Sequence, residues 1–323
     1  VSGDTVRWQY LANDLWDTAK ITDQTVAAIG ETLFWFKEYD SSLVTVCTSD
    51  INSPKVWSEE IDIVSTDLPS LASIYNWNDT FFAVGNGGSI MTSTDGISWT
   101  ATAPTAQFAS ILGVQFATKN YKEHLHAIVK EKDVYRFAKT YDGINWEIGD
   151  VCPDGFPIRN FSQPVSDKAK PQSGNVTSRL YIVGGETADG EMTSSTWSCD
   201  GFSWAEFQQG FLPAMTRPAI IQYTLDTNAP KSLWILWPGK YANGSVKNEV
   251  YFSENKGVTW KLFKSEFSKY ADTQKIMPVG HVSAILNQNN YWMYFFGGVD
   301  SEGKQQANIF GGQLMTLVFD KIK

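Results

Sequence analysis

Ser93-Thr94-Asp95-Gly96-Ile97-Ser98-Trp99 is the stretch that decides the fold, because the chain contains this pattern several times. Thr140-Tyr141-Asp142-Gly143-Ile144-Asn145-Trp146 and Ser198-Cys199-Asp200-Gly201-Phe202-Ser203-Trp204 repeat it. Ser253-Glu254-Asn255-Lys256-Gly257-Val258-Thr259-Trp260 is one residue longer and has Asn in place of Asp. Thr48-Ser49-Asp50, followed by an insertion and Trp57, is a degenerate fifth copy. Such self-similarity predicts a fold built from repeated units.

Each copy has the composition of a tight turn between two strands. Asp-Gly between strand-like runs is a strong hairpin signal, because the Asp side chain bonds the backbone ahead and Gly adopts the positive φ. The Trp three residues after the Gly begins the returning strand and supplies a large apolar surface. We therefore interpret these aspartates as turn-building residues and not as catalytic carboxylates. The structural set is Asp95, Trp99, Asp142, Trp146, Asp200, Trp204, Asn255 and Trp260.

These turns resemble the Asp-box of sialidase-like β-propellers, where the motif closes the hairpin between the outer two strands of a blade. Arg179-Leu180-Tyr181-Ile182-Val183-Gly184-Gly185 and Tyr291-Trp292-Met293-Tyr294-Phe295-Phe296-Gly297-Gly298 resemble the kelch strand that ends in a double glycine, although the later kelch Tyr/Trp pattern is replaced by the Asp-box. The whole is similar to secreted propellers of gut Bacteroidetes, a resemblance that implies no established activity.

The spacing of the repeats predicts one all-β domain, a six-bladed β-propeller of four-stranded antiparallel blades over residues 1–323. The hairpin tryptophans from Trp57 to Trp260 lie 42 to 58 residues apart, close to the period of about 50 typical of kelch blades. We expect the blades at residues 21–60, 69–102, 107–149, 158–208, 217–264, and 279–319 together with 5–11. The strand around Trp8 is expected to complete the sixth blade and close the ring. The alternative is a run over 314–319 as its outer strand.

Composition narrows the classes of function. The net charge of −9, from 26 basic and 35 acidic residues, disfavours nucleic acids and anionic lipid surfaces as partners. No apolar run reaches the ~18 residues of a membrane span, so membrane insertion is not expected. Three cysteines, Cys47, Cys152 and Cys199, cannot all pair within the chain, and we expect free thiols.

A binding site is predicted at one mouth of the central channel, where the innermost strands of the blades converge. Four residues before the aligned Ile29, Ile74, Ile111, Gln163, Ile221 and Ile285 stands a ring of polar residues, namely Thr25, Ser70, Gln107, Arg159, Arg217 and His281. Two arginines and a histidine suit a carboxylate or a sugar. The alternative is that these side chains cap the strand starts.

Long polar loops between the second and third strands are expected at the same mouth, and Tyr241 on one of them is predicted to stack on a sugar. The loop carboxylates Glu186, Asp189, Glu191, Asp300 and Glu302 show no spacing that marks an acid and a nucleophile. His124 and His126 share a strand face, yet with one further histidine in the chain no metal site is predicted. Neither a nucleophile elbow nor a phosphate loop is present, and no cofactor is expected.

These observations favour a non-catalytic, exported and monomeric binding module that recognises a glycan or a protein partner. Its expected location is the periplasm or the cell surface, with a lipid anchor as one option. The alternative is a propeller glycoside hydrolase or lyase that uses loop carboxylates, and a third hypothesis is a scaffold.

Overall fold

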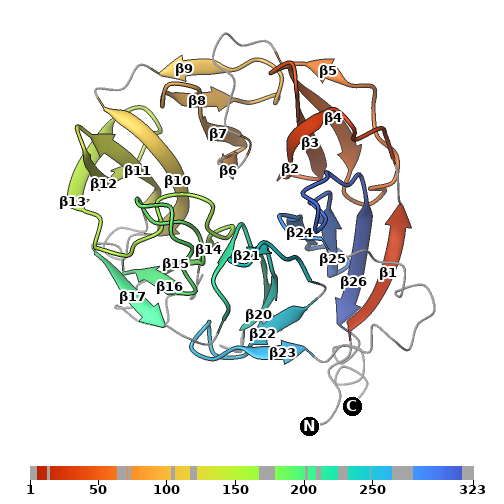
Figure 1. Ribbon diagram of the computed structural model, residues 1–323. Coiled ribbons are helices and arrows are strands. Elements are labelled where there is room, and N and C mark those ends of the chain that lie inside the picture. Colours follow the sequence, from red (N-terminus) through yellow and green to blue (C-terminus); the bar gives the residue numbers. More distant parts are fainter. Residues whose placement is uncertain are drawn as a thin grey trace.

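The computed structural model describes residues 6–12, 15–63, 71, 74–102, 106–116, 122–166, 179–200, 203–208, 212–224, 232–247, 249–263 and 279–314. These residues form six four-stranded antiparallel sheets arranged as blades around a centre (Figure 1). The predicted six-bladed propeller is therefore confirmed. Within the described ranges, no helix is long and apolar enough to span a membrane.

The first three blades follow chain order from the inner to the outer strand. Blade 1 consists of β2 (Ile21–Ile29), β3 (Thr32–Tyr39), β4 (Val44–Asp50) and β5 (Ile61–Asp62). Blade 2 consists of β6 (Tyr75–Trp77), β7 (Thr80–Val84), β8 (Ile90–Ser93) and β9 (Thr100–Thr102). Blade 3 consists of β10 (Gln107–Phe116), β11 (Glu123–Glu131), β12 (Val134–Thr140) and β13 (Trp146–Val151).

The last three blades carry additional short pairings at one end. Blade 4 consists of β14 (Val165–Ser166), β15 (Leu180–Val183), β16 (Thr196–Cys199) and β17 (Trp204–Gln208). Blade 5 consists of β19 (Ala219–Thr224), β20 (Ser232–Trp237), β22 (Val250–Ser253) and β23 (Lys261–Phe263). A small ribbon of β18 (Met215–Thr216) and β21 (Lys240–Tyr241) accompanies it. Blade 6 consists of β24 (Ser283–Asn287), β25 (Trp292–Phe296), β26 (Ile309–Leu314) and β1 (Val6–Ala12).

The N-terminal strand closes the ring, as predicted. β1 pairs antiparallel with β26, with Trp8 opposite Gly312, so the two ends of the chain share one sheet. The inner strands β2, β6, β10, β14, β19 and β24 each contact their neighbours, and β24 returns to β2. Closure protects β26, which would otherwise be an exposed sheet edge.

Six apolar clusters fill the six wedges between adjacent blades, and they form the core of the molecule. The wedge between blades 1 and 2 holds Phe34, Phe36, Phe81 and Trp99, with Phe34 and Phe81 edge to face at 5.0 Å. The wedge between blades 6 and 1 holds Trp35 and Phe296, with Trp16 and Trp57 packed against them. The aromatic content of 14% thus supplies the packing between blades.

The four turn repeats lie between the third and fourth strands of blades 2, 3, 4 and 5. In blade 2, the backbone N–H groups of Ile97 and Ser98 both donate to Asp95 Oδ1 at 2.8 Å. Gly96 has φ +73°, and an added Cβ would lie 2.9 Å from the ring of Phe34. The glycine therefore serves both the turn and the close approach of the neighbouring blade.

Parts of the predicted blade ranges are not strands. Residues 56–59 are not a strand, because the insertion in blade 1 forms a loop held by the Trp57 indole, which donates to the Pro54 carbonyl at 2.9 Å. The outer strand begins instead at Ile61. The inner strand of blade 4 begins at Val165, although this blade is predicted from residue 158. The inner strand of blade 2 is Tyr75–Trp77, although that blade is predicted from residue 69. The alternative closing run over 314–319 lies, beyond Leu314, outside the described residues.

The cysteines are free, as expected. Cys47 and Cys199 are buried, and Cys152 is partly buried. Burial raises the pKa of Cys47 to about 11 and that of Cys152 to about 12, so both are thiols at neutral pH.

Candidate functional site

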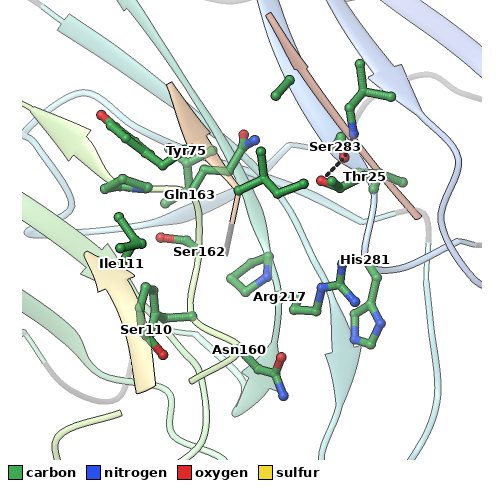
Figure 2. Close-up of a pocket in the computed structure, with 18 of the residues that line it drawn as sticks. Thr25, Tyr75, Ser110, Ile111, Asn160, Ser162, Gln163, Arg217, His281 and Ser283 are labelled. Atoms are coloured by element: carbon green, nitrogen blue, oxygen red, sulfur yellow. Dashed lines mark hydrogen bonds between the residues drawn. The ribbon is translucent and has the colours of Figure 1, made fainter. Parts of the chain in front are cut away.

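A central cavity of about 460 Å³ is bounded by the inner strands of five blades and, in blade 4, by residues 159–164 ahead of β14. Its size falls in the range of small-ligand sites. The polar side chains that line it are Thr25, Tyr75, Asn76, Ser110, Arg159, Asn160, Ser162, Gln163, Arg217, His281 and Ser283. The remaining lining is aliphatic, aromatic or proline. Figure 2 shows several of these side chains projecting into one space from different strands.

Blades 4, 5 and 6 share one local construction at the mouth of this cavity. In each blade a residue ahead of the inner strand pairs with the residue three positions after the end of the second strand. The pairs are Arg159 with Glu186, Thr216 with Lys240, and Gly280 with Val299. The next residue then adopts a left-handed backbone conformation. These three residues are Asn160, Arg217 and His281, with φ of 54°, 46° and 56°.

The shared backbone brings the side chains of Asn160, Arg217 and His281 to the same end of the cavity (Figure 2). Positive φ is strained for a residue with a long side chain and is uncommon outside Gly, Asn and Asp. Three such residues at equivalent positions indicate that the backbone aims these side chains at the mouth. The Arg217 N–H also donates to the Asn160 carbonyl at 2.5 Å, which ties blade 5 to blade 4.

Both mouth arginines are paired with carboxylates. Arg217 Nη1 donates to Asp23 Oδ1 at 2.9 Å, which links blade 5 to blade 1. The two side chains are 19% and 25% exposed, so water screens the pair only in part. Arg159 Nε donates to Glu186 Oε2 at 2.8 Å, and Asn160 Nδ2 donates to Glu186 Oε1 at 3.1 Å. The mouth therefore presents both donors and acceptors, and each of its two arginines is balanced by a carboxylate.

His281 is neutral at physiological pH. Burial, with Arg217 and Lys240 nearby, lowers the pKa of this imidazole to about 3. Its Nε2 lies 3.0 Å from Thr216 Oγ1. A neutral imidazole adds hydrogen-bonding capacity without charge.

Deeper in the cavity, several polar groups tie one blade to the next. Ser283 Oγ accepts from the Val26 N–H at 2.8 Å and lies 3.1 Å from Thr25 Oγ1. Asn76 Nδ2 donates to the Ala28 carbonyl at 2.8 Å. Among the described residues, Asn76 Oδ1 has no hydrogen-bond partner, so it is an acceptor that a ligand could satisfy.

Four members of the predicted polar ring line the cavity, namely Thr25, Arg159, Arg217 and His281. The alignment was wrong by one residue in blade 4, because the equivalent of Arg217 is Asn160 and not Arg159. Ser70 lies outside the described residues.

Gln107 and Tyr241 do not line the cavity, in contrast to the prediction. Two irregularities in the β10–β11 register lengthen β10, so Ser110 lines the cavity instead of Gln107. The side chain of Gln107 lies against Gly88. Tyr241 is 5% exposed, because the pairing of β18 with β21 folds its loop inward, and its hydroxyl donates to Glu249 at 3.1 Å. It therefore offers no face for stacking on a sugar.

Except for Glu186, which accepts from Arg159 and Asn160 at the mouth, the loop carboxylates lie apart from the cavity lining. Asp300 is buried in its own loop, where the N–H groups of Glu302 and Lys304 donate to it at 2.9 Å. Asp189 and Glu191 are exposed. No carboxylate is among the described residues that line the central cavity.

His124 and His126 lie buried between blades 3 and 4. Their ring centroids are 4.6 Å apart, and burial lowers the pKa of both, to about 3 for His126. In the described ranges no group of three or more His, Cys, Asp and Glu side chains could hold a metal ion.

Solved structures similar to this chain are propellers with little sequence identity. A structure of YjhT is 11% identical and has a TM-score of 0.55, with coverage of 90% of this chain and 94% of that one. A Trypanosoma rangeli sialidase complexed with 2,3-difluorosialic acid is 9% identical with a TM-score of 0.57; it matches 93% of this chain, which spans 54% of the sialidase's length. An Aleuria aurantia lectin complexed with Fucα1-6GlcNAc is 12% identical with a TM-score of 0.50, and the match covers 90% of this chain and 93% of the lectin. At these identities the likeness concerns the fold alone.

No curated protein matches the sequence. The model of the DUF6242 beta propeller domain matches residues 2–322. The chain therefore belongs to the DUF6242 β-propeller domain family.

Proposed function

We propose that the protein is a non-catalytic binding module that recognises a neutral saccharide at the mouth of its central cavity. The observation that carries this proposal is the set Asn160, Arg217 and His281, three polar side chains held by the same strained backbone at one end of a 460 Å³ cavity. Strain of this kind clusters at ligand sites. The lectin and sialidase among the similar structures are compatible with a carbohydrate ligand.

The charge balance at the mouth favours a neutral ligand. Arg217 and Arg159 are each paired with a carboxylate, and His281 is uncharged at neutral pH. An anionic sugar would have to compete with Asp23 or Glu186 for its guanidinium. Hydroxyl groups, in contrast, can donate to the carboxylates and accept from the arginines at the same time.

A glycan array tests the site with a matched set of variants. Glycine at positions 217 and 281 removes both side chains and accepts the positive φ of the native backbone. We expect wild-type protein to bind a class of neutral glycans and Arg217→Gly/His281→Gly to lose at least tenfold in affinity. Arg136→Ala removes an arginine that pairs with Glu131 on blade 3, and it should bind like the wild type. Equal binding by all three proteins would refute the proposed site.

The Asp23→Asn variant tests the role of charge balance. It replaces the carboxylate that pairs with Arg217 and leaves the guanidinium with an unbalanced positive charge. We expect the variant to gain affinity for carboxylated glycans relative to neutral ones. An unchanged preference would show that the ion pair does not set specificity.

Hydrolysis is the competing function, and it is tested on the same ligand. The carboxylates at the mouth, Asp23 and Glu186, are both bonded to arginines, whereas a general acid needs a protonated carboxyl group. We expect a bound glycan to remain intact after prolonged incubation, as measured by mass spectrometry. Release of shorter products that Glu186→Gln abolishes would establish a hydrolase.

This proposal also includes export to the periplasm or the cell surface and an origin in Bacteroidetes. It further includes the Asp-box and kelch-like character of the repeats. The sequence patterns of the turns and double glycines support the last of these.

A further inference from the structure

A second concave site lies on the outside of the propeller, where blade 6 meets blade 1. We call it the outer groove, and its volume is about 430 Å³. Lining residues that matter here are Gln9, Asn52, Lys55, Val56, Trp292 and Tyr294. The turn over residues 40–43 precedes β4 and the loop over 51–60 follows it, so the two lie at opposite ends of the blade. The Asp40 N–H donates to the Lys20 carbonyl, just before β2, which places the turn at the same end as Asp23 and the mouth. The outer groove is therefore at the other end of the blades from the mouth.

One wall of the groove comes from a feature that departs from the repeat. The turn between the third and fourth strands carries an insertion in blade 1, and residues 52–56 of that insertion build one wall. On the facing blade, Gly311 leaves no open space: an added Cβ would lie 2.7 Å from the Met293 carbonyl oxygen, 3.3 Å from Leu11 Cδ1 and 3.4 Å from Trp292 Cε3. Both of these side chains line the groove.

Aromatic rings form the other wall. Tyr294 is 5% exposed and stacks against the partly exposed Trp292, with centroids 6.3 Å apart and planes at 18°. The buried tyrosine therefore fixes the orientation of the tryptophan. Val56 is 73% exposed at the rim, which is a high exposure for an aliphatic side chain next to an aromatic wall.

We propose that the outer groove binds an acidic saccharide, with a pyranose ring against Trp292 and its carboxylate near Lys55. The C–H groups of a sugar ring are electropositive and suit the negative face of an indole. The amides of Gln9 and Asn52 supply donors and acceptors for hydroxyl groups. Lys55 is exposed and is the charged side chain among the described lining residues. Its ammonium group supplies a local positive charge for the carboxylate on a protein whose net charge is −9.

This proposal is independent of the site at the mouth, because the two sites share no lining residue. Val56→Glu places a negative charge at the rim of the outer groove. Ile144→Glu is its matched control, since Ile144 is 69% exposed on the corresponding turn of blade 3 and lines neither cavity. Both changes affect exposed side chains, so both variants should keep the melting temperature of the wild type.

The test is titration calorimetry with oligogalacturonate as the acidic probe and maltotriose as the neutral one. We expect wild type to bind oligogalacturonate at least tenfold more tightly than maltotriose at this site. Val56→Glu and Lys55→Gln should each lose tenfold or more, while Ile144→Glu and Arg217→Gly/His281→Gly should bind it like wild type. Absence of oligogalacturonate binding, or binding that Val56→Glu leaves unchanged, would overturn the proposal.

Discussion

At the scale of single residues, the glycines of the turn repeats carry two constraints that can be separated. Gly143 has φ +77°, and an added Cβ would lie 2.9 Å from the ring of Phe82 in the neighbouring blade. Gly155 has nearly the same φ, +76°, but open space around the added Cβ. Gly155→Ala should lower the free energy of unfolding by about 1 kcal/mol, the cost of left-handed backbone. Gly143→Ala should lower it by about 2–3 kcal/mol because the ring must also move. Equal losses in urea titrations would show that the ring contact contributes nothing.

The aspartate of the repeat makes the turn sensitive to acid. The side-chain amide of Asn145, with the N–H groups of Asn145 and Ile144, lowers the pKa of Asp142 below its ordinary value. Because the pKa of Asp142 is lower in the folded state than in the unfolded state, the ionised side chain stabilises the folded protein above pH ~4. This stabilisation is lost as the pH falls below that value. In the repeat of blade 5, Asn255 accepts the Thr259 N–H with an amide oxygen that does not titrate.

Asp142→Asn should therefore fold with the same turn but lose this dependence on pH. We expect wild type to melt at a higher temperature than the variant at pH 7, and the difference to shrink below pH 4. Thermal melts from pH 2 to 7 measure it. A difference that stays constant over this range would contradict the assigned role of Asp142.

At the scale of elements, the wedge between the first and last blades contains a buried charge. Lys37 is fully buried on β3; its amine lies 2.5 Å from Glu60 Oε1 and 3.7 Å from the ring centre of Trp16. Tyr39 and Thr45 donate to the other oxygen of Glu60. A buried charge without its partner is costly, so Glu60 stabilises the wedge that closes the ring.

Glu60→Gln should lower the free energy of unfolding by about 2–3 kcal/mol, because the buried ammonium keeps only a neutral partner. Adding Lys37→Met removes that charge and should recover most of the loss, which a double-mutant cycle measures. Additive effects of the two changes would show that the pair is not coupled.

Strands of the blades were more predictable than their exact register at the mouth. β7 (Thr80–Val84), β12 (Val134–Thr140) and β20 (Ser232–Trp237) lie within the blades predicted at residues 69–102, 107–149 and 217–264. Side chains alternate faces along a strand, so an alignment error of one residue assigns to the cavity a side chain that packs between two blades. Ile221 was aligned to the channel, yet it is Ile220 that lines the cavity, and Ile221 packs between blades 5 and 6.

The contacts that define the candidate site were not visible in the sequence. Asp23 and Arg217 are 194 positions apart and meet only because the ring closes. Tyr241 belongs to a polar loop, and nothing local indicated the β18–β21 pairing that buries it. The left-handed backbone at Asn160 likewise follows from the bridge between Arg159 and Glu186.

At the scale of the whole molecule, β1 is the element that completes the ring. Deletion of residues 1–12 would leave β26 as an unpaired edge, which promotes association between chains. We expect the melting temperature to fall by about 5–10 °C, from the loss of several kcal/mol of pairing, and light scattering to show aggregation. Deletion of residues 1–5 keeps β1 intact and is the control. Equal behaviour of both truncations would show that β1 does not stabilise the ring.

The central claim is that the mouth of the cavity binds a saccharide, and a crystal structure of the protein soaked with the tightest neutral glycan from the array tests it most directly. We predict electron density for a sugar ring in the central cavity, with hydroxyl groups within hydrogen-bond distance of Asn160, Arg217 and His281. Density for the neutral glycan only outside this cavity, with the mouth unchanged, would contradict the claim.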